Sequence, residues 1–173
     1  MNDPVQKKCV NIAILTVSDT RTLENDTSGQ TLVDRLQAAG HHLADRQIVK
    51  DEIPLLQGTL RQWIDRPDVD VVIATGGTGV TGRDVTPEAF EGLYEKSIPG
   101  FGELFRWLSY QNIKTSTIQS RATAGVAKGT FLFALPGSTG ACKDAWDQIL
   151  VHQMDSTHRP CNLVELMPRL MEK

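Results

Sequence analysis

A glycine-rich segment followed by an arginine and an aspartate could bind phosphate. Residues 75–79 read TGGTG, and Arg83 and Asp84 follow shortly after them. Glycine allows backbone N–H groups to approach a phosphate closely and tolerates positive φ angles. Arg83 could bind a phosphate bidentately, and Asp84 could hold Mg²⁺ through a carboxylate oxygen. The same pattern also suits a tight turn followed by a solvated pair of charges, so this segment alone leaves both interpretations open.

Polar turns follow apolar, strand-like runs at four places in the chain. They are Ser18-Asp19, Asp51-Glu52, residues 76–79 and residues 136–138. In a parallel sheet all four turns lie at the carboxyl edge of the strands, where open α/β folds bind their ligands. The sequence therefore predicts one ligand site built from four separate loops.

Two carboxylates of this edge could act together. Asp51 and Asp84 are predicted on neighbouring loops, where they could jointly bind Mg²⁺ and align a phosphoryl group for in-line attack. The alternatives are local. Asp51 and Glu52 also suit an acidic turn before a helix, and Ser18 and Asp19 could simply cap nearby backbone groups.

Other nucleotide-binding motifs fit this chain poorly. Residues 77–82 formally match GxGxxG, but residues 84–87 delay the helix that should begin directly at the glycines. Glu95 and Glu103 lie in helix-like or loop context, so a strand-end acid is missing at the expected downstream distance. Because Gly-Lys-Ser/Thr does not follow the glycines, the phosphate-binding P-loop fails as well.

The elements that must position these turns alternate along the chain. Apolar, β-branched runs predict strands at 10–17, 42–49, 69–75 and 130–135. Helical spacing predicts helices at 28–39, 55–64, 101–110 and from Ser138 to about Met154, and Thr86 is expected to be the N-cap of a further helix. This alternation predicts a three-layer α/β/α fold with a mostly parallel sheet, helices on both faces and right-handed crossovers.

Composition indicates a single globular domain of 173 residues with a formal net charge of -3. This charge argues against a broad nucleic-acid surface. The start of the chain lacks the apolar segment of a secretory signal, and the longest apolar run is of strand length, so we expect a cytoplasmic protein without a membrane segment. We expect a flexible N-terminus at 1–9, the α/β domain at 10–155, and a tail at 156–173 packed on the domain or on a neighbouring subunit.

The histidines and tryptophans add little to the site. The histidines lack the spacing of metal ligands and are expected at the surface or partly packed, and the tryptophans lie in helical contexts that suit the core or a subunit contact. These residues are His41, His42, His152, His158, Trp63, Trp107 and Trp146.

An ordered set of motifs resembles the MogA/MoaB family of molybdenum cofactor biosynthesis proteins, which includes the G domain of gephyrin. Residues 75–89, TGGTGVTGRDVTPEA, resemble the family signature. The further matches are ILTVSD at 14–19, DTSG at 26–29, TSTIQSRATAG at 115–125 and LPGS at 135–138. Together they cover almost the whole chain from about residue 10 to 165.

The resemblance implies a reaction in which molybdopterin and Mg-ATP give adenylylated molybdopterin and pyrophosphate. Asp51 and Asp84 would be the essential acidic residues and would place Mg²⁺. The nucleotide-binding residues implied are Gly76, Gly77, Thr78, Gly79 and Arg83. The substrate-binding residues implied are Ser18, Asp19, Ser120, Arg121, Pro136, Gly137 and Ser138.

Within this family, residues 100–106 and 159–162 look more like the MoaB branch. Some bacterial members of that branch lack the acidic residues, whereas Asp51 and the run 83–87 are present here, which favours a competent enzyme. The alternative is a carrier that binds molybdopterin or a precursor without adenylylating it. The resemblance also implies a homo-oligomer, either a trimer or a hexamer.

Overall fold

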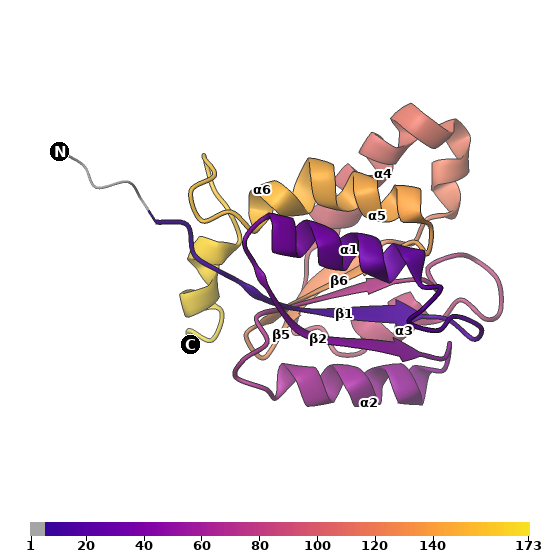
Figure 1. Cartoon of the computed structure of the whole chain (residues 1–173), viewed down its shortest axis with the longest axis horizontal. Helices are drawn as coiled ribbons and strands as arrows, with labels where there is room; N and C mark the ends of the chain where they lie inside the picture. Colours follow the sequence, from indigo (N-terminus) through magenta and orange to yellow (C-terminus); the bar gives the residue numbers. More distant parts are fainter. Residues whose placement is uncertain (1–5) are drawn as a thin grey trace.

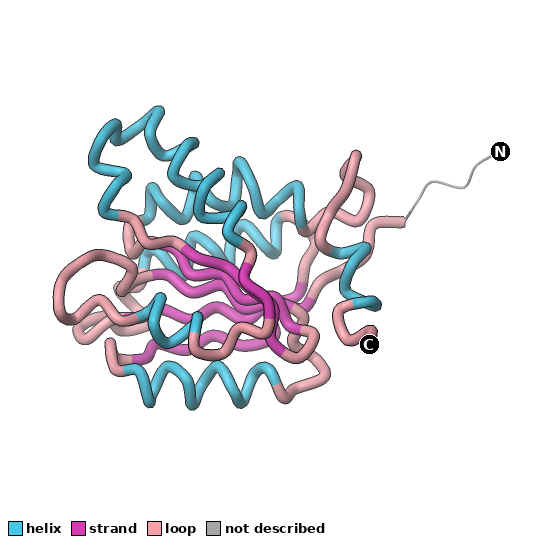
Figure 2. Tube along the Cα trace, turned by 180° about the vertical axis from the view of Figure 1, so that it is seen from behind, coloured by secondary structure: helices cyan, strands magenta, loops and turns pink. Residues whose placement is uncertain are grey.

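A computed structural model describes residues 6–173 as one mixed β-sheet between two layers of helices (Figure 1; Figure 2 shows the same layers from behind). The N-terminal segment expected to be flexible at 1–9 lies partly outside this range. The six strands of the described chain have the order β2-β1-β3-β6-β5-β4. They are β1 Asn11–Val17, β2 His42–Val49, β3 Val71–Thr75, β4 Lys96–Ser97, β5 Thr123–Ala127 and β6 Thr130–Leu135.

Four consecutive strands of the sheet, β2, β1, β3 and β6, are parallel, as the sequence predicts. β1 pairs with β2 and β3, and β3 pairs with β6, always in parallel. Two strands were not predicted: β5 runs antiparallel to β6, and β4 runs antiparallel to β5. A two-residue turn joins β5 to β6, in which Lys128 and Gly129 both have positive φ, the geometry of a type I′ hairpin.

The helices confirm the predicted alternation, with shifts of a few residues at their ends. The α-helices are α1 Thr27–Ala38, α2 Ile53–Ile64, α3 Thr86–Glu91, α4 Pro99–Ile113, α5 Thr139–Ala145 and α6 Val151–Gln153. A π-helical turn, Trp146–Leu150, joins α5 to α6, so the predicted helix to Met154 is interrupted in its hydrogen bonding but not in its path. Two 3₁₀ segments, Lys114–Gln119 and Val164–Arg169, were not predicted.

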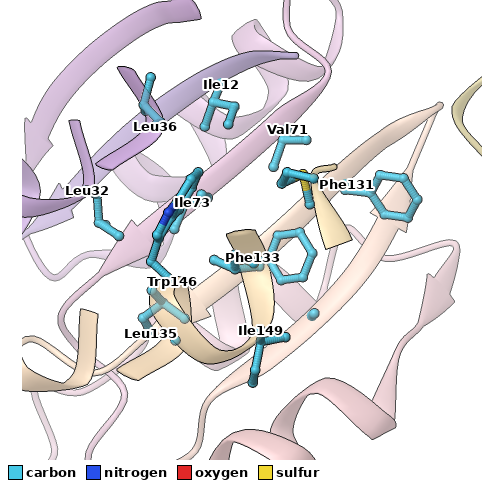
Figure 3. Packing of buried hydrophobic residues seen from close by; sticks show 14 of the residues in the cluster. Ile12, Leu32, Leu36, Val71, Ile73, Phe131, Phe133, Leu135, Trp146 and Ile149 are labelled. Atoms are coloured by element: carbon cyan, nitrogen blue, oxygen red, sulfur yellow. The ribbon is translucent and has the colours of Figure 1, made fainter. Parts of the chain in front are cut away.

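The core has one half on each side of the sheet. Figure 3 shows the first half, in which strand residues such as Ile73 and Phe133 pack against helix residues such as Leu36 and Trp146. The second half packs the opposite face of the sheet against α2 and α3 through side chains such as Trp63. The three-layer prediction is therefore confirmed.

The tryptophans and His41 differ in exposure, which the sequence did not predict. Trp107 on α4 is 64% exposed, whereas Trp63 and Trp146 are buried. His41, expected to be at most partly packed, is buried, and its Nδ1 accepts a hydrogen bond from the Val10 amide at 3.2 Å. Over residues 6–173, none of the helices is both long enough and apolar enough to span a bilayer.

Candidate functional site

The carboxyl ends of four parallel strands bring the predicted polar turns together. The final residues of β1 and β2, Val17 and Val49, are partners, and the end of β3, Thr75, pairs with Leu135 at the end of β6. The arrows of β1 and β2 point towards the same side of the molecule (Figure 1), and β3 and β6 run parallel to them. The turns at 18–19, 51–52, 76–79 and 136–138 therefore lie along one edge of the sheet, as predicted.

The glycine loop at 76–79 is held tightly against its neighbours. Gly76 and Gly77 have φ angles of +109° and +66°. A Cβ atom on Gly76 would lie 2.2 Å from the carbonyl oxygen of Val17, and one on Gly77 would lie 2.7 Å from Oδ1 of Asp51. Neither position has room for a side chain, and both favour glycine conformationally.

Thr86 fixes this loop from the start of α3. Its hydroxyl donates to the carbonyl of Gly76 at 2.8 Å, and its amide donates to the carbonyl of Gly77 at 3.0 Å. The prediction that Thr86 is the N-cap of the helix is therefore wrong, because Val85 occupies that position and Thr86 is the first helical residue. The threonine side chain stabilises the loop instead of the helix end.

Asp84 lies on one side of the glycine loop. Its Oδ2 accepts hydrogen bonds from the amide of Thr81 at 2.9 Å and from the hydroxyl of Thr81 at 2.7 Å. Partial burial raises the pKa of Asp84, but hydrogen bonds from Thr81 and from the Gly79 amide outweigh burial, so its pKa is lowered overall. This carboxylate is accordingly ionised at neutral pH and fixed in position.

Asp51 lies on the other side of the loop, in a different electrostatic environment. Partial burial raises its pKa, the negative charges of Asp19 and Asp84 raise it further, and Arg83 only partly offsets them. A carboxylate that is desolvated and faces two other carboxylates favours a nearby cation.

The acidic residues fit a metal ion that a nucleotide brings with it. Within residues 6–173, three or more His, Cys, Asp or Glu side chains do not gather anywhere as a metal-binding group. Mg²⁺ at nucleotide sites is commonly held by one or two carboxylates together with substrate phosphates and water. Asp51 and Asp84 match this arrangement.

Arg83 has a partner that the sequence did not predict, whereas Ser18 caps the local backbone, which was one of the two interpretations left open. The guanidinium of Arg83 forms an exposed ion pair with Asp19, with Nη2 2.7 Å from Oδ2, and this hydrogen bond lowers the pKa of Asp19. Arg83 would have to exchange this partner in order to bind a phosphate. Ser18 accepts hydrogen bonds from the amides of Thr20 and Arg21, so its hydroxyl caps the local backbone.

A cavity of about 730 Å³ opens from the glycine loop towards α4 and α5. Its lining includes these predicted residues: Gly77, Thr78, Gly79, Asp84, Ser120, Pro136, Gly137 and Ser138. The lining does not include Ser18, Asp19, Asp51, Gly76, Arg83 or Arg121. The predicted site residues therefore form two groups: one group lines the cavity, and the other belongs to the same sheet edge but does not line the cavity.

The sequence did not predict the opposite wall of the cavity. Phe105, Ser109 and Ile113 line it from α4, and Lys143 lines it from α5. Phe105, Ser109 and Ile113 are spaced by four residues and so lie on one face of α4. The polar Ser109 within this otherwise apolar stripe was a signal in the sequence that the face could line a site. Lys143 is the basic side chain of the lining, and the acidic Asp144 lines the cavity beside it.

Arg121, expected among the substrate-binding residues, is directed at the glycine loop. Its Nε donates to the carbonyl of Gly79 at 2.7 Å, and its Nη2 donates to the carbonyl of Asp84 at 2.8 Å. Ser138 lines the cavity but also caps α5, because its hydroxyl accepts from the amide of Ala141 at 3.1 Å. These two side chains therefore shape the walls of the site.

Comparison with known proteins shows similarity throughout the chain. The family model described as a probable molybdopterin binding domain matches residues 13–156. Molybdenum cofactor biosynthesis protein B of Escherichia coli (strain K12) is 52% identical over 151 residues, covering 87% of this chain and 89% of that protein.

Solved structures show the same similarity. A crystal structure of a molybdenum cofactor biosynthesis protein B has a TM-score of 0.86 and 40% identity, covering 96% of this chain and 98% of the other. The tungsten cofactor synthesizing protein MoaB from Pyrococcus furiosus has a TM-score of 0.74 and 36% identity, covering 83% and 91%. The residues that the family model matches include every predicted site residue from Ser18 to Ser138.

Proposed function

Because this chain belongs to the molybdopterin-binding domain family of molybdenum cofactor biosynthesis proteins, we propose that it transfers an adenylyl group from ATP to molybdopterin. The terminal phosphate oxygen of molybdopterin attacks the α-phosphorus of ATP. A new P–O bond forms, the bond between the α-phosphorus and the bridging oxygen breaks, and pyrophosphate leaves with that oxygen. The family resemblance expected from the sequence motifs is confirmed, and the role of the chain lies in molybdenum cofactor biosynthesis.

One observation carries this proposal: a glycine loop lies between two carboxylates and also forms the mouth of a large cavity. Asp51 lies against Gly77 and Asp84 lies against Gly79. The cavity of about 730 Å³ that starts at the same glycines has the size of a small-molecule site. The phosphates of ATP bound at the loop and a pterin bound in the cavity would therefore lie next to each other.

The residue types suit a transfer between two phosphates. Attack of one phosphate on another is opposed by like charges, so backbone N–H groups and cations directed at the developing charge should dominate catalysis. Mg²⁺ bound with ATP would supply neutralising charge, and Asp51 and Asp84 would hold it. Lys143 would add charge from the cavity side. The attacking phosphate is already an anion at neutral pH, so a strong general base is not required.

Label transfer tests the proposal directly. The purified protein is mixed anaerobically with molybdopterin, Mg²⁺ and α-labelled ATP, and the label on the pterin is measured. Asp84→Ala should lower transfer by about 100-fold or more, because positioned charge in phosphoryl-type transfers has effects of that size. Asp68→Ala is the matched control, because Asp68 is an exposed carboxylate paired with Arg66. Full transfer by Asp84→Ala would contradict the site assignment.

The carrier alternative rests on a separate observation. Asp51 and Arg83 do not line the cavity, so a pterin could bind there without contacting either residue. A carrier should bind molybdopterin tightly and leave the label on ATP. Binding without any transfer in the unmutated protein would favour the carrier and contradict the adenylyltransferase.

A further inference from the structure

The guanidinium of Arg121 reaches both ends of one exposed loop. It donates from Nε to the carbonyl of Gly79 at 2.7 Å and from Nη2 to the carbonyl of Asp84 at 2.8 Å. Its third nitrogen, Nη1, donates to the carboxylate of Glu88 in the first turn of α3. The three hydrogen bonds leave the side chain about one third exposed. Arg121 therefore joins the start of the loop, its end and the following helix.

The backbone of Arg121 adds a fourth connection, because its amide donates to the carbonyl of Thr78 at 3.0 Å. The segment that follows the 3₁₀ helix Lys114–Gln119 thus runs beside the glycine loop and is bonded to it. The residues between the two carbonyls, 80–83, are exposed. Their shape depends on how the ends of the loop are held.

Few other hydrogen bonds hold residues 79–84 to the rest of the described chain. The hydrogen bonds between Thr81 and Asp84 are internal to the loop. The remaining external hydrogen bonds are those of Arg121 and those between Arg83 and Asp19. If Arg83 leaves Asp19 to bind a phosphate, the anchor that remains is Arg121.

An arginine suits this position better than a lysine. The guanidinium is planar and presents its N–H groups in a fixed fork, so it can meet two carbonyls and a carboxylate at once. A lysine at the same place carries a point charge on a flexible stem. Its ammonium group could retain one of these partners at good geometry but not all three.

We propose that Arg121 is a positioning residue that keeps the loop from Gly79 to Asp84 in its phosphate-binding shape, and is not a contact to the pterin. This inference rests on the proposed function, in which Asp84 holds the Mg²⁺ that accompanies ATP. It replaces the substrate-binding role expected for Arg121 from the family resemblance. Loss of Arg121 therefore weakens the use of Mg-ATP and leaves the pterin site intact.

The first experiment compares the two substrates in steady-state kinetics. Arg121→Lys should raise KM for Mg-ATP by about tenfold, which corresponds to the loss of one or two charge-assisted hydrogen bonds. KM for molybdopterin should change less than about twofold. Arg106→Lys is the matched control, because Arg106 donates to the carbonyls of Ser120 and Ala122 in the same segment and not to the loop. A rise confined to KM for molybdopterin would show a pterin contact and overturn the proposal. A loss of kcat with both KM values unchanged would also overturn it.

The second experiment measures the loop without turnover. Trypsin cleaves after Arg83, within the exposed part of the loop, and mass spectrometry identifies that cut. Arg121→Lys should be cut there several-fold faster than the unmutated protein, and Arg121→Ala faster still, because fewer hydrogen bonds then hold the ends of the loop. Circular dichroism checks that the variants are folded, and Glu88→Gln supplies a milder variant that keeps the arginine. Cleavage at Arg83 that is unchanged in Arg121→Lys would refute the proposed hold on the loop.

These experiments separate this inference from the proposed function. If the unmutated protein neither binds nor uses Mg-ATP, the proposed function fails, while the cleavage at Arg83 still decides whether Arg121 holds the loop. If the unmutated protein transfers label and Arg121→Lys does so with unaltered KM for Mg-ATP, the proposed function stands and the role of Arg121 is wrong.

Discussion

At the scale of residues, the site contains two aspartates whose surroundings shift their pKa values in opposite directions. Hydrogen bonds to Thr81 and to the Gly79 amide lower the pKa of Asp84. Burial and two neighbouring carboxylates raise the pKa of Asp51. Asp84 is therefore stabilised as an anion by the protein itself, whereas Asp51 is an anion that a bound cation would stabilise.

This contrast predicts that Asp51→Asn stabilises the protein while abolishing its proposed activity. The amide removes a partly buried negative charge that faces Asp19 and Asp84. In the absence of Mg²⁺ we expect Tm to rise by about 1–3 °C, since 1 kcal/mol corresponds to roughly 2–4 °C in a chain of this size. Asp84→Asn is the matched comparison and should lower Tm, because it disturbs the hydrogen bonds from Thr81.

Differential scanning calorimetry in the presence of a chelator measures both changes. A fall in Tm for Asp51→Asn would show that the carboxylate of Asp51 stabilises the folded protein. The proposed repulsion between Asp51 and its two acidic neighbours would then be wrong.

The individual site residues were predictable to different degrees. The glycines, Asp51 and Asp84 follow strands, so their place at one edge followed from the alternation of strands and helices alone. The hydrogen bonds of Arg121 and the exposure of Lys143 to the cavity depend on contacts across the fold, and local sequence does not encode them. The pairing of Arg83 with Asp19 across 64 positions was unpredictable for the same reason.

At the scale of elements, β5 leads directly from the site segment into the sheet, and its middle residue has no room for a side chain. A Cβ atom on Gly125 would lie 2.4 Å from Cγ of Tyr94, whose ring is partly buried against the core. The ring of Tyr94 therefore occupies the place of a side chain on this strand. Any enlargement at Gly125 must displace either the ring or the strand.

We accordingly predict that Gly125→Ala lowers the free energy of unfolding by about 1–3 kcal/mol, the usual range for overpacking. Gly58→Ala is the matched control: Gly58 is exposed within α2, and a Cβ there meets nothing within 4 Å. That substitution should stabilise the protein by about 0.5–1 kcal/mol, since glycine disfavours a helix interior. Urea unfolding of the two variants measures both values, and an equal effect of the two substitutions would contradict the packing described at Tyr94.

Some strands of the sheet were predictable from the sequence and others were not. The buried strands β1, β3 and β6 are apolar and β-branched or aromatic, and all three were predicted within two residues. β5 reads TAGVA and β4 contains two residues, so neither has the alternation or length that identifies a strand. Their pairing is stabilised by the hairpin to β6 and by tertiary packing, which local propensity does not report.

At the scale of the whole molecule, α4 presents an apolar stripe to solvent. Leu104, Trp107, Tyr110 and Ile113 follow one another at intervals of three residues and are each more than 40% exposed. Large exposed apolar patches mark interaction surfaces in many proteins. We propose that a second copy of this chain covers the stripe, in line with the homo-oligomer expected from the family resemblance.

Trp107→Glu should therefore shift the protein towards a monomer. Placing a charge in an apolar contact requires its desolvation, so dissociation should be detectable by sedimentation velocity at micromolar concentration. Leu55→Glu is the control, because Leu55 is about as exposed as the residues of the α4 stripe but lies on α2. An unmutated protein that sediments as a monomer would contradict the expected homo-oligomer, and an unchanged oligomer in Trp107→Glu would exclude this stripe as its contact.

The buried His41 makes global stability depend on pH. Burial lowers its pKa below the ordinary value of 6.5, and Lys7 lowers it further, while Asp155 partly opposes this shift. The unfolded chain therefore takes up this proton at a higher pH than the folded chain. The stability due to neutral His41 is complete above pH 6.5 and is lost as the pH falls from there towards the lowered pKa of the folded state.

We expect the free energy of unfolding in urea to be lower at pH 5 than at pH 7 through this residue, and His41→Gln should remove that part of the pH dependence. His42→Gln, at the exposed neighbouring position, should retain it. If both variants keep the same pH dependence as the unmutated protein, His41 is not its source.

The strand order also has a consequence for how the chain emerges during synthesis. β3 ends at Thr75, but its second neighbour in the sheet, β6, begins only at Thr130. At about 5–20 residues per second, ribosomes need several seconds to make the intervening segment, during which one edge of β3 and its apolar side chains lack their partner. An unpaired, apolar strand edge is prone to intermolecular association. A nascent chain arrested between β3 and β6 should therefore bind chaperones more strongly than the complete, released chain, in which β6 covers the exposed edge of β3.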